Sequence, residues 1–336
     1  RMKDQSALLD LRRKGICLDP NRYHLLDCLE NRDDLELLFE LLDEHRDNRG
    51  NPPAFTFNTV MANPNFEAIR ADRFERYANE CLWQSYERHH GDDLRDLWQQ
   101  AMSASLIKPQ FHGREHLNVR LWMNDLQTGH DDAHKAFDHE YFGLITRTSS
   151  QRQRHYLAAN WPESPDHLKE IQGIVVDGLR MFEEFFGFRS ETFVACNYIW
   201  PKELESTTAD SGVRLIQAQR GQLRPESNGG ASVFRAYTGM RNSNNQIYSV
   251  RNVMFEPYED DSKDWVASAI KEIGQSFDWG KPAVVCTHRI NYVGGMCRKH
   301  RGRTLSLLSD LLKKILSRWP DVEFLSSDQL LATIEQ

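Results

Sequence analysis

Two histidines, His112 and His116, carry the strongest chemical signal in this sequence of 336 residues. Their four-residue spacing places two side chains on one face of a helical turn, close enough to share a metal ion. Neutral imidazole is the commonest metal ligand among protein side chains. Gly113 leaves room for a ligand between them, and Arg114 and Glu115 add charge beside the pair. The sequence therefore predicts a metal site, although two histidines at this spacing also occur by chance.

The residues on either side predict the elements that hold the pair. Leu106 and Ile107 end an apolar run that is typical of a buried strand. Apolar residues at helical spacing follow the pair: Leu117, Leu121, Trp122 and Leu126. We therefore expect the pair where a strand gives way to a helix. A second pair with the same spacing, His130 and His134, lies in a polar stretch without a preceding strand and ranks below the first.

A third histidine, His288, lies near the end of a separate apolar run over residues 282–289, the clearest buried strand in the sequence. In a barrel of parallel strands, the carboxyl ends of the strands lie on one face. We therefore expect His288 to face the same cavity as His112 and His116 and to act as a general acid. The alternative is a core histidine that bonds a backbone carbonyl.

Five further residues at or near strand ends are candidates for substrate binding: Asn58, Arg114, Asn197, Trp200 and Arg289. Asn58 is equally typical of a strand-end turn, so its assignment stays open between turn formation and binding. Trp200 offers an indole ring that either stacks on a sugar or packs beneath a loop. Arg114 and Arg289 place positive charge next to the candidate histidines.

Apolar strands and amphipathic helices alternate along the chain, which indicates parallel strands covered by helices. No glycine-rich dinucleotide turn and no P-loop occurs, so a barrel is favoured over an open sheet. No internal repeat divides the chain, so we expect a single domain over residues 1–336. Residues 221–249 are rich in Asn, Ser and Gly and interrupt the alternation. They are predicted to form an inserted loop or hairpin that acts as a mobile lid or rim near the site.

The composition limits the classes of partner and location. The 42 basic and 49 acidic residues are well mixed and give a net charge of -7, so nucleic acid is not an expected partner. No apolar run reaches the roughly 18 residues of a membrane span. The six cysteines form no Cys-x-x-Cys pair, which favours reduced thiols and a cytoplasmic protein. Because the sequence begins with Arg1 and Met2, a periplasmic or secreted location stays open, and the oligomeric state is not predicted.

Three segments together resemble a known family: residues 55–60 (FTFNTV), 112–116 (HGREH) and 287–289 (THR). They are similar to segments of the polysaccharide deacetylase (NodB-like) superfamily, and more closely to those of a divergent bacterial subgroup. The resemblance covers most of the chain and implies an α/β fold, a distorted (β/α) barrel of the glycoside hydrolase/deacetylase type. In this family an Asp and an H-x3-5-H motif bind a divalent metal, a neighbouring Asp is the base, and a late-strand His is the general acid. By resemblance, His112 and His116 are metal ligands and His288 is the acid.

One departure from the family affects the expected site. The family carries paired Asp residues on its first strand, whereas the first strand visible here carries Asn58 and no such pair. Either Asn58 replaces the Asp and the site is altered, or the Asp pair lies on a strand just before Arg1. Sequences that resemble this one typically place Asp-Asp-Trp-Gly directly before Arg-Met, so we favour the second account. The chain would then lack the first strand of its barrel, the third metal ligand and the base.

The function expected from these residues is metal-dependent removal of an acyl group, acetyl first, from a carbohydrate. Zinc is the leading metal, with cobalt, manganese and nickel as alternatives. The alternative function is a non-catalytic glycan-binding barrel, or a degenerate deacetylase that acts in polysaccharide assembly. A metal-dependent phosphoesterase is a third class, but it would require more carboxylates near the histidines.

Overall fold

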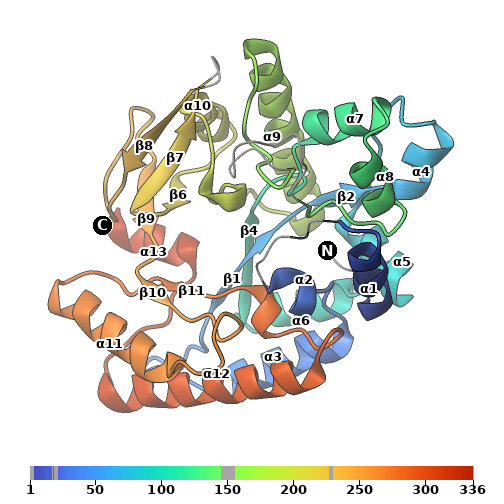
Figure 1. Cartoon of the computed structure of the whole chain (residues 1–336). Helices are drawn as coiled ribbons and strands as arrows, with labels where there is room; N and C mark the ends of the chain where they lie inside the picture. Colours follow the sequence, from blue (N-terminus) through green and yellow to red (C-terminus); the bar gives the residue numbers. More distant parts are fainter. Residues whose placement is uncertain (1–3, 17, 19–21, 145–155, 227–229, 336) are drawn as a thin grey trace.

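The computed structural model describes residues 4–16, 18, 22–144, 156–226 and 230–335. At its centre lies a sheet of five parallel strands in the order β1-β4-β5-β6-β9 (Figure 1). These strands are β1 (Phe55–Thr59), β4 (Ile107–Phe111), β5 (Thr192–Val194), β6 (Leu215–Ala218) and β9 (Ile247–Val250). The α/β class with parallel strands, predicted from the alternation, is therefore confirmed.

Three smaller strand pairs accompany the central sheet. They are the parallel pair β10 (Val253–Met254) and β11 (Val285–Cys286), and the antiparallel pairs β2 (Ala62–Pro64) with β3 (Asn79–Cys81) and β7 (Gly221–Pro225) with β8 (Ala231–Arg235). β10 follows β9 closely in the chain and pairs in parallel with β11, outside the central sheet. Within the part of the chain that the structure describes, no strand joins β11 to β1, and closure into a barrel is therefore not shown.

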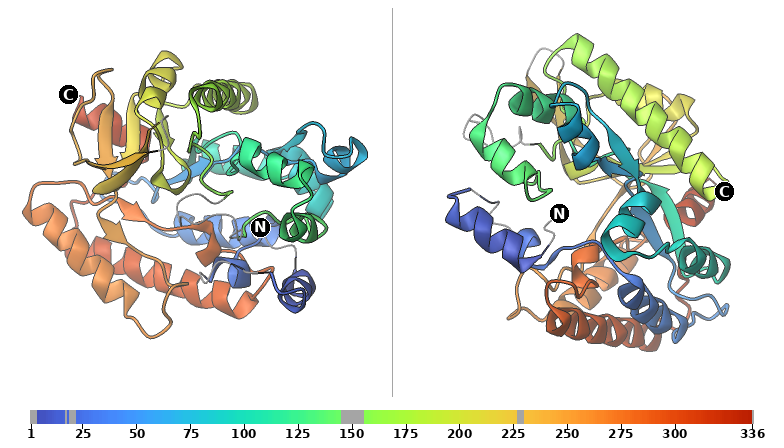
Figure 2. Two further views of the ribbon diagram at one scale, coloured as in Figure 1. Left: turned by 45° about the horizontal axis from the view of Figure 1, so that its top comes forward. Right: turned by 90° about the vertical axis from the view of Figure 1, so that its right-hand side faces the viewer.

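Helices surround the sheet (Figures 1 and 2). In one buried cluster, Val175 and Phe182 of α9 pack with Phe111 at the end of β4 and Phe193 of β5. Helices α3, α6, α11 and α12 contribute to a second cluster that includes Ile107 at the start of β4. Among the described residues, no helix has the length and apolar character needed to cross a membrane.

The helices have the following bounds: α1 (Gln5–Arg13), α2 (Tyr23–Leu26), α3 (Arg32–Asp43), α4 (Phe66–Ala71), α5 (Leu82–His90), α6 (Arg95–Ser103), α7 (Val119–Gln127), α8 (Asp131–Phe137), α9 (Pro165–Phe186), α10 (Glu203–Asp210), α11 (Trp265–Asp278), α12 (Arg298–Arg318) and α13 (Ser327–Ile334). Two short 3-10 turns follow strands: η1 (Cys196–Tyr198) follows β5, and η2 (Arg289–Asn291) follows β11.

The longest helix shows how local signals set its ends. The side chain of Ser164 accepts a hydrogen bond from the backbone N–H of His167, and Pro165 occupies the first helical position. Gly187 ends the helix with φ +74°, a left-handed conformation that glycine adopts without a steric penalty. These residues in the sequence, Ser164-Pro165 and Gly187, predict the start and the end of a helix, and the structure confirms both.

The inserted region over residues 221–249 has two parts. β7 and β8 form an antiparallel hairpin, and Val233 of this hairpin is 67% exposed. β9 begins at Ile247 and is a buried strand of the central sheet, so the end of this region belongs to the scaffold. The role of the hairpin as a mobile lid or rim stays a prediction, as does the single-domain organisation of the chain.

His167 at the start of α9 is expected to make the folded state sensitive to acid. The residue is 2% exposed, and its Nδ1 accepts a hydrogen bond of 3.2 Å from the backbone N–H of Glu163, which requires a ring without a proton on Nδ1. Burial, and next the charge of Arg120, lower the pKa of His167 to about 4. The unfolded chain has a His pKa near 6.5, so the stabilising contribution is complete above about pH 6.5 and is lost as the pH falls toward 4.

We expect this loss to reach on the order of 1–3 kcal/mol in the free energy of unfolding. Urea unfolding at pH 7.0, 5.5 and 4.5 measures it, and His167→Gln should flatten the profile because glutamine does not titrate. A His167→Gln variant that loses stability as steeply as the natural chain would show that another group is responsible.

Candidate functional site

His112 and His116 lie together in the loop that connects β4 to α7. Their ring centroids are 5.3 Å apart, and the rings are inclined at 73° to each other. The sequence predicted that a helical turn would bring them together, and this was wrong, because α7 begins only at Val119. Instead the loop turns at Gly113, whose φ of +124° is rarely adopted by residues with a side chain. The loop conformation, and not helical periodicity, therefore brings the two rings into proximity.

A hydrogen bond fixes the protonation pattern of His112. Its Nδ1 lies 2.8 Å from the carbonyl oxygen of Val194, at the end of β5. A carbonyl oxygen only accepts, so Nδ1 carries the hydrogen and Nε2 keeps its lone pair in the neutral ring. Metal-binding histidines commonly donate their other N–H in this way, which orients the ring and raises its basicity. His112 is therefore prepared to act as a ligand through Nε2.

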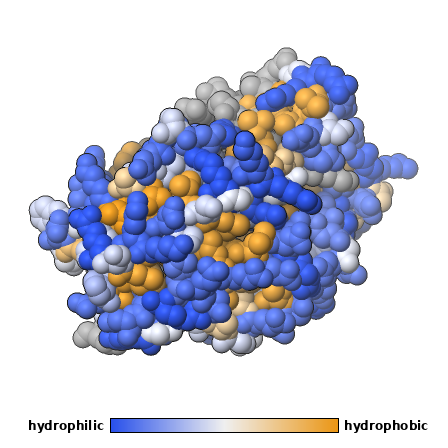
Figure 3. Space-filling view, turned by 90° about the horizontal axis from the view of Figure 1, so that it is seen from below, coloured by the Kyte–Doolittle hydropathy of each residue, from blue (hydrophilic) through white to orange (hydrophobic). Residues whose placement is uncertain are grey.

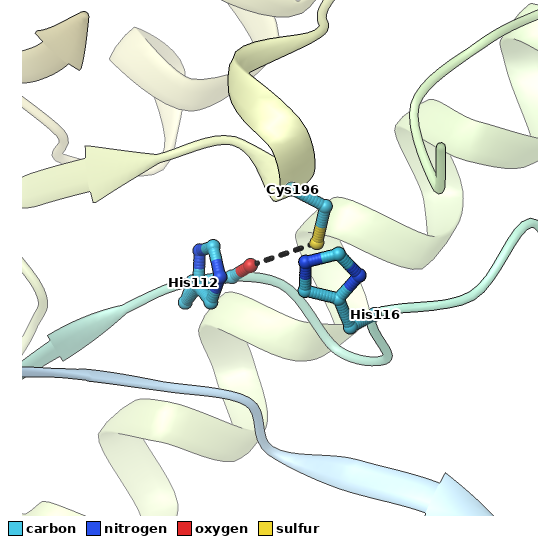
Figure 4. Close-up of side chains that lie close together, drawn as sticks. All are labelled: His112, His116 and Cys196. Atoms are coloured by element: carbon cyan, nitrogen blue, oxygen red, sulfur yellow. Dashed lines mark hydrogen bonds between the residues drawn. The ribbon is translucent and has the colours of Figure 1, made fainter. Parts of the chain in front are cut away.

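Cys196 completes a group of three potential metal ligands with the two histidines (Figure 4). Ligand atoms of the three side chains all lie within 4.8 Å of one another. The Cys196 thiol donates a hydrogen bond of 3.3 Å to the backbone carbonyl of His112, and burial raises its pKa. A Cβ at Gly113 would lie 3.3 Å from this sulfur, so the position favours glycine for space as well as for conformation. Two imidazoles and a thiolate form a donor set that suits zinc or cobalt.

His288 belongs to a second polar group, centred on the buried carboxylate of Glu256. His288 Nδ1 lies 2.5 Å from Glu256 Oε1, and Asn291 Nδ2 donates to Glu256 Oε2 at 2.9 Å. The Glu256 side chain is 1% exposed, whereas that of His288 is 40% exposed. Because the carboxylate accepts, Nδ1 of His288 donates, and Nε2 is the nitrogen left for proton transfer. This carboxylate–imidazole arrangement is typical of an acid or base held in one orientation.

A three-residue turn, η1, connects the two groups. Its first residue, Cys196, contacts the His112 backbone, and the hydroxyl of its last residue, Tyr198, lies 4.0 Å from the sulfur of Cys286. Cys286 in turn donates to Glu256 at 3.5 Å. Asn197 and Tyr198 have φ of +55° and +54°, which is unfavourable for residues with a side chain. Backbone strain of this kind concentrates at functional sites, and here it lies between the two histidine groups.

Six of the predicted site residues line one cavity of about 1960 Å³: Asn58, His112, His116, Asn197, His288 and Arg289. Asn58 accepts a hydrogen bond of 3.0 Å from Gln217, and Gln217 accepts one of 3.1 Å from Arg251. Arg251 also donates to the sulfur of Cys286 at 3.3 Å. A chain of polar contacts therefore runs from Asn58 on β1 toward the His288 group. The individual roles of these residues in catalysis or binding stay predictions.

Two of the predicted substrate-binding residues, Arg114 and Trp200, are not among the residues that line the cavity. Arg114 bonds Glu115 at 2.8 Å and Asp177 of α9 at 2.9 Å, and it is not among the residues that line the cavity. Trp200 is 1% exposed and packs in the core, so it has no free face for a sugar. Both residues contribute to packing.

Arg289 lines the cavity but is already engaged. Its guanidinium bonds Asp27 at 2.7 Å and Glu30 at 2.8 Å, which ties the segment before α3 to η2. Substrate binding by Arg289 would therefore have to compete with these two carboxylates.

The sequence analysis missed two residues, Cys196 and Glu256. The sequence predicts a strand over residues 192–198, which includes Cys196 as a small apolar side chain, whereas the observed strand ends at Val194 and leaves Cys196 in the turn that follows. Glu256 follows β10 before Pro257, but its contact with His288 joins positions that are far apart in the sequence. Glu256 and His288 come together only because β10 and β11, which precede them, pair in parallel.

Comparisons with known proteins find distant structural similarities. No protein-family model matches the chain, and no curated protein matches it. Among solved structures, the chain is similar to a protein from Mycobacterium smegmatis provisionally assigned as a polysaccharide deacetylase, with 11% identity and a TM-score of 0.45, over 90% of this chain and 77% of that chain. It is also similar to the α-amylase AmyC from Thermotoga maritima, with 9% identity and a TM-score of 0.43, over 98% of this chain and 68% of that chain.

A third similar structure is a GH57 branching enzyme from Thermococcus kodakaraensis, with 10% identity and a TM-score of 0.38, over 97% of this chain and 64% of that chain. These likenesses concern the overall fold and carry no information about activity. The resemblance to deacetylases in the three sequence segments therefore stays a prediction.

The ligand group predicts the effect of removing either histidine. We expect His112→Ala and His116→Ala each to lower the affinity for Co²⁺ or Zn²⁺ by roughly 10- to 100-fold, because each removes one donor. Titration with Co²⁺, followed by its visible absorption, measures the affinity. His130→Ala is a matched control, since it changes the second pair of the same spacing and should leave the affinity unchanged. Equal affinity in all three variants and the natural chain would exclude this site.

Proposed function

We propose that this chain is a metal-dependent hydrolase that removes an acyl group, acetyl first, from a carbohydrate. The observation that carries the proposal is the arrangement of two different histidine groups around one cavity. His112 and His116 offer ligand nitrogens, while His288 is held by the buried carboxylate of Glu256. Hydrolysis of an ester or amide needs an activated water on one side of the carbonyl and a proton donor for the leaving group.

The donor atoms fit a divalent ion, for which zinc is the first choice and cobalt, manganese and nickel are alternatives. His112 and His116 would hold it, with Cys196 as a further donor whose sulfur favours zinc or cobalt over manganese. When bound, such an ion polarises the acyl carbonyl and lowers the pKa of a bound water toward about 7.

His288 would supply the proton for the leaving group. As the bond between the acyl carbon and the sugar oxygen or nitrogen breaks, Nε2–H of His288 gives its proton to that atom. Glu256 accepts from Nδ1–H throughout, which keeps the ring in one orientation. The water oxygen forms the new bond to the acyl carbon and its protons pass to solvent, from which His288 regains a proton. The products are a carboxylate and a free sugar hydroxyl or amine. Asn58 and Asn197, at the wall of the cavity, are proposed to bind sugar hydroxyls.

The second candidate function is carbohydrate binding without turnover. It is favoured by one observation, that the described ligand group around His112 and His116 contains no carboxylate that could act as the base for an attacking water. Release of acetate separates the two functions, because a binding protein releases none from an acetylated oligosaccharide.

The role of His288 predicts a split between binding and turnover. His288→Ala should leave the metal affinity unchanged and lower the rate of acetate release by roughly 10²- to 10⁴-fold, because the leaving group then departs without its proton. Metal titration and acetate release from acetylated oligosaccharides measure the two effects. His90→Ala is the control, since His90 also lines the cavity but belongs to neither histidine group. Loss of metal binding in His288→Ala would show that His288 is a ligand.

Glu256 is proposed to position His288, and this role predicts its own effect on the kinetic constants. Glu256→Gln removes the negative charge but retains a hydrogen-bond acceptor, so we expect kcat to fall while KM changes little. A purely structural role would instead reduce the free energy of unfolding and would not separate kcat from KM in this way.

A further inference from the structure

Three side chains near the ends of β10 and β11 form a second group of potential metal ligands, separate from the group around His112. They are Glu256, Cys286 and His288, and their ligand atoms all lie within 4.8 Å of one another. In the part of the chain that the structure describes, this is one of two groups in which three such atoms come so close. Because β10 and β11 pair in parallel, the residues at and just after their carboxyl ends meet in one place.

The distances between the donor atoms are close to those around one small ion. On a tetrahedral zinc ion, ligand atoms lie roughly 3.3–3.8 Å from one another. The sulfur of Cys286 lies 3.5 Å from Oε1 of Glu256 and already has this spacing. Nδ1 of His288 lies 2.5 Å from the same oxygen, so the ring must move outward to share an ion with it. The His288 side chain is 40% exposed and has room to move, whereas Glu256 and Cys286 are buried.

Neighbouring side chains hold the two buried ligands. Asn291 Nδ2 donates to Glu256 Oε2 at 2.9 Å, which leaves Oε1 directed toward Cys286 and His288. Arg251 Nη1 donates to the sulfur of Cys286 at 3.3 Å. Burial raises the pKa of the Cys286 thiol, and the charge of Arg251 acts in the opposite direction. Partners of this kind orient metal ligands and tune their affinity.

The cavity gives an ion access to this group. His288 and Arg251 line the cavity, as does Tyr198, whose hydroxyl lies 4.0 Å from the sulfur of Cys286. Glu256 and Cys286 are not among the lining residues, so an ion reaches them past the His288 ring. The ion must open the contact between His288 and Glu256 and lies near the positive charge of Arg251. We therefore expect it to bind more weakly than an ion at His112.

We propose that Glu256, Cys286 and His288 bind a second divalent ion, zinc before cobalt, and that this ion inhibits the hydrolase. The ion bonds to Sγ of Cys286, Oε1 of Glu256 and Nδ1 of His288. The thiol proton passes to solvent, and the remaining hydrogen of the neutral imidazole lies on Nε2. A neutral imidazole is a far weaker acid than the protonated ring, so His288 no longer gives a proton to the leaving group. The inhibition rests on the proposed function, whereas the binding of the second ion does not.

Titration with Co²⁺ tests the second site without any substrate. A bond between Co²⁺ and a thiolate absorbs in the near ultraviolet, and Cys196 would contribute the same band, so the titration starts from the Cys196→Ser chain. We expect this chain to retain a thiolate band and to lose it on the further change Cys286→Ser. Added to the same chain, Glu256→Gln and His288→Ala should each lower the affinity that the band reports by roughly 10- to 100-fold. His288→Ala leaves the ion at His112 in place and weakens the second ion alone.

Cys297→Ser is the matched control, because it makes the same chemical change at a free cysteine outside both ligand groups. It also accounts for weak binding to the surface, since hydrophilic side chains cover much of the face seen from below (Figure 3). The band and its affinity should be unchanged in this control. Absence of a thiolate band in Cys196→Ser, or an equal band after Cys286→Ser, would overturn the site. If Cys286→Ser does not fold, His288→Ala decides, because an unchanged affinity there would also overturn it.

Acetate release at increasing zinc concentration tests the inhibition. The rate should rise as the first ion binds and fall as the second ion binds. In Cys286→Ser the fall should move to at least 10-fold higher zinc concentration, whereas in Cys297→Ser it should stay in place. A fall at the same concentration in Cys286→Ser and the natural chain would overturn the inhibition. No acetate release at any zinc concentration would contradict the proposed function and the inhibition together, while the Co²⁺ titration still decides whether the second site exists.

Discussion

The turn after β5 is the constraint on which the arrangement of the site depends. Asn197 and Tyr198 both have positive φ, at a cost of roughly 1–2 kcal/mol each for residues with a side chain. The cost is offset by contacts on either side of the turn. Cys196 donates to the carbonyl of His112, and Tyr198 contacts Cys286 and lies over the guanidinium of Arg251. A relaxed turn would direct these side chains elsewhere and separate the two histidine groups.

The polar residues behind the turn are stable only as a set. Gln217 donates to Asn58 and accepts from Arg251, and Arg251 also donates to Cys286, which contacts Glu256. A buried polar atom that loses its partner costs about 1–3 kcal/mol, so removal of one member leaves its neighbours unsatisfied. The set spans β1, β6 and the strands near β11. It therefore fixes the relative positions of strand ends that share no direct backbone pairing.

The sequence predicted those features that depend on local pattern or on strand direction. The α/β class, the helix between Ser164 and Gly187, and the position of His112 directly after a strand all follow from periodicity and capping. What it could not predict depends on packing between distant segments. Helical spacing gave the wrong reason for the proximity of His112 and His116, because a glycine loop competes with helix formation there.

The positions of Trp200 and Arg114 away from the cavity depend on packing in the same way. Trp200 and Arg114 have side chains suited to a sugar or to an anion, but the sequence does not say which face of an element is buried. The indole of Trp200 packs in the core, where its N–H reaches Glu205 at 3.4 Å. Arg114 donates a hydrogen bond to Asp177 of α9, which lies 63 positions away in the sequence. Residue type therefore indicates the chemistry that is available, and only the fold decides whether it faces the cavity.

The different partners of His112 and His288 are the basis for the two roles proposed for them. His112 directs Nδ1–H to a neutral carbonyl, which orients the ring. His288 directs Nδ1–H to the carboxylate of Glu256. A metal ligand must be neutral, whereas a general acid must carry a proton before it acts. Metal binding is therefore proposed for the histidine that a carbonyl orients, and proton transfer for the histidine that a carboxylate orients.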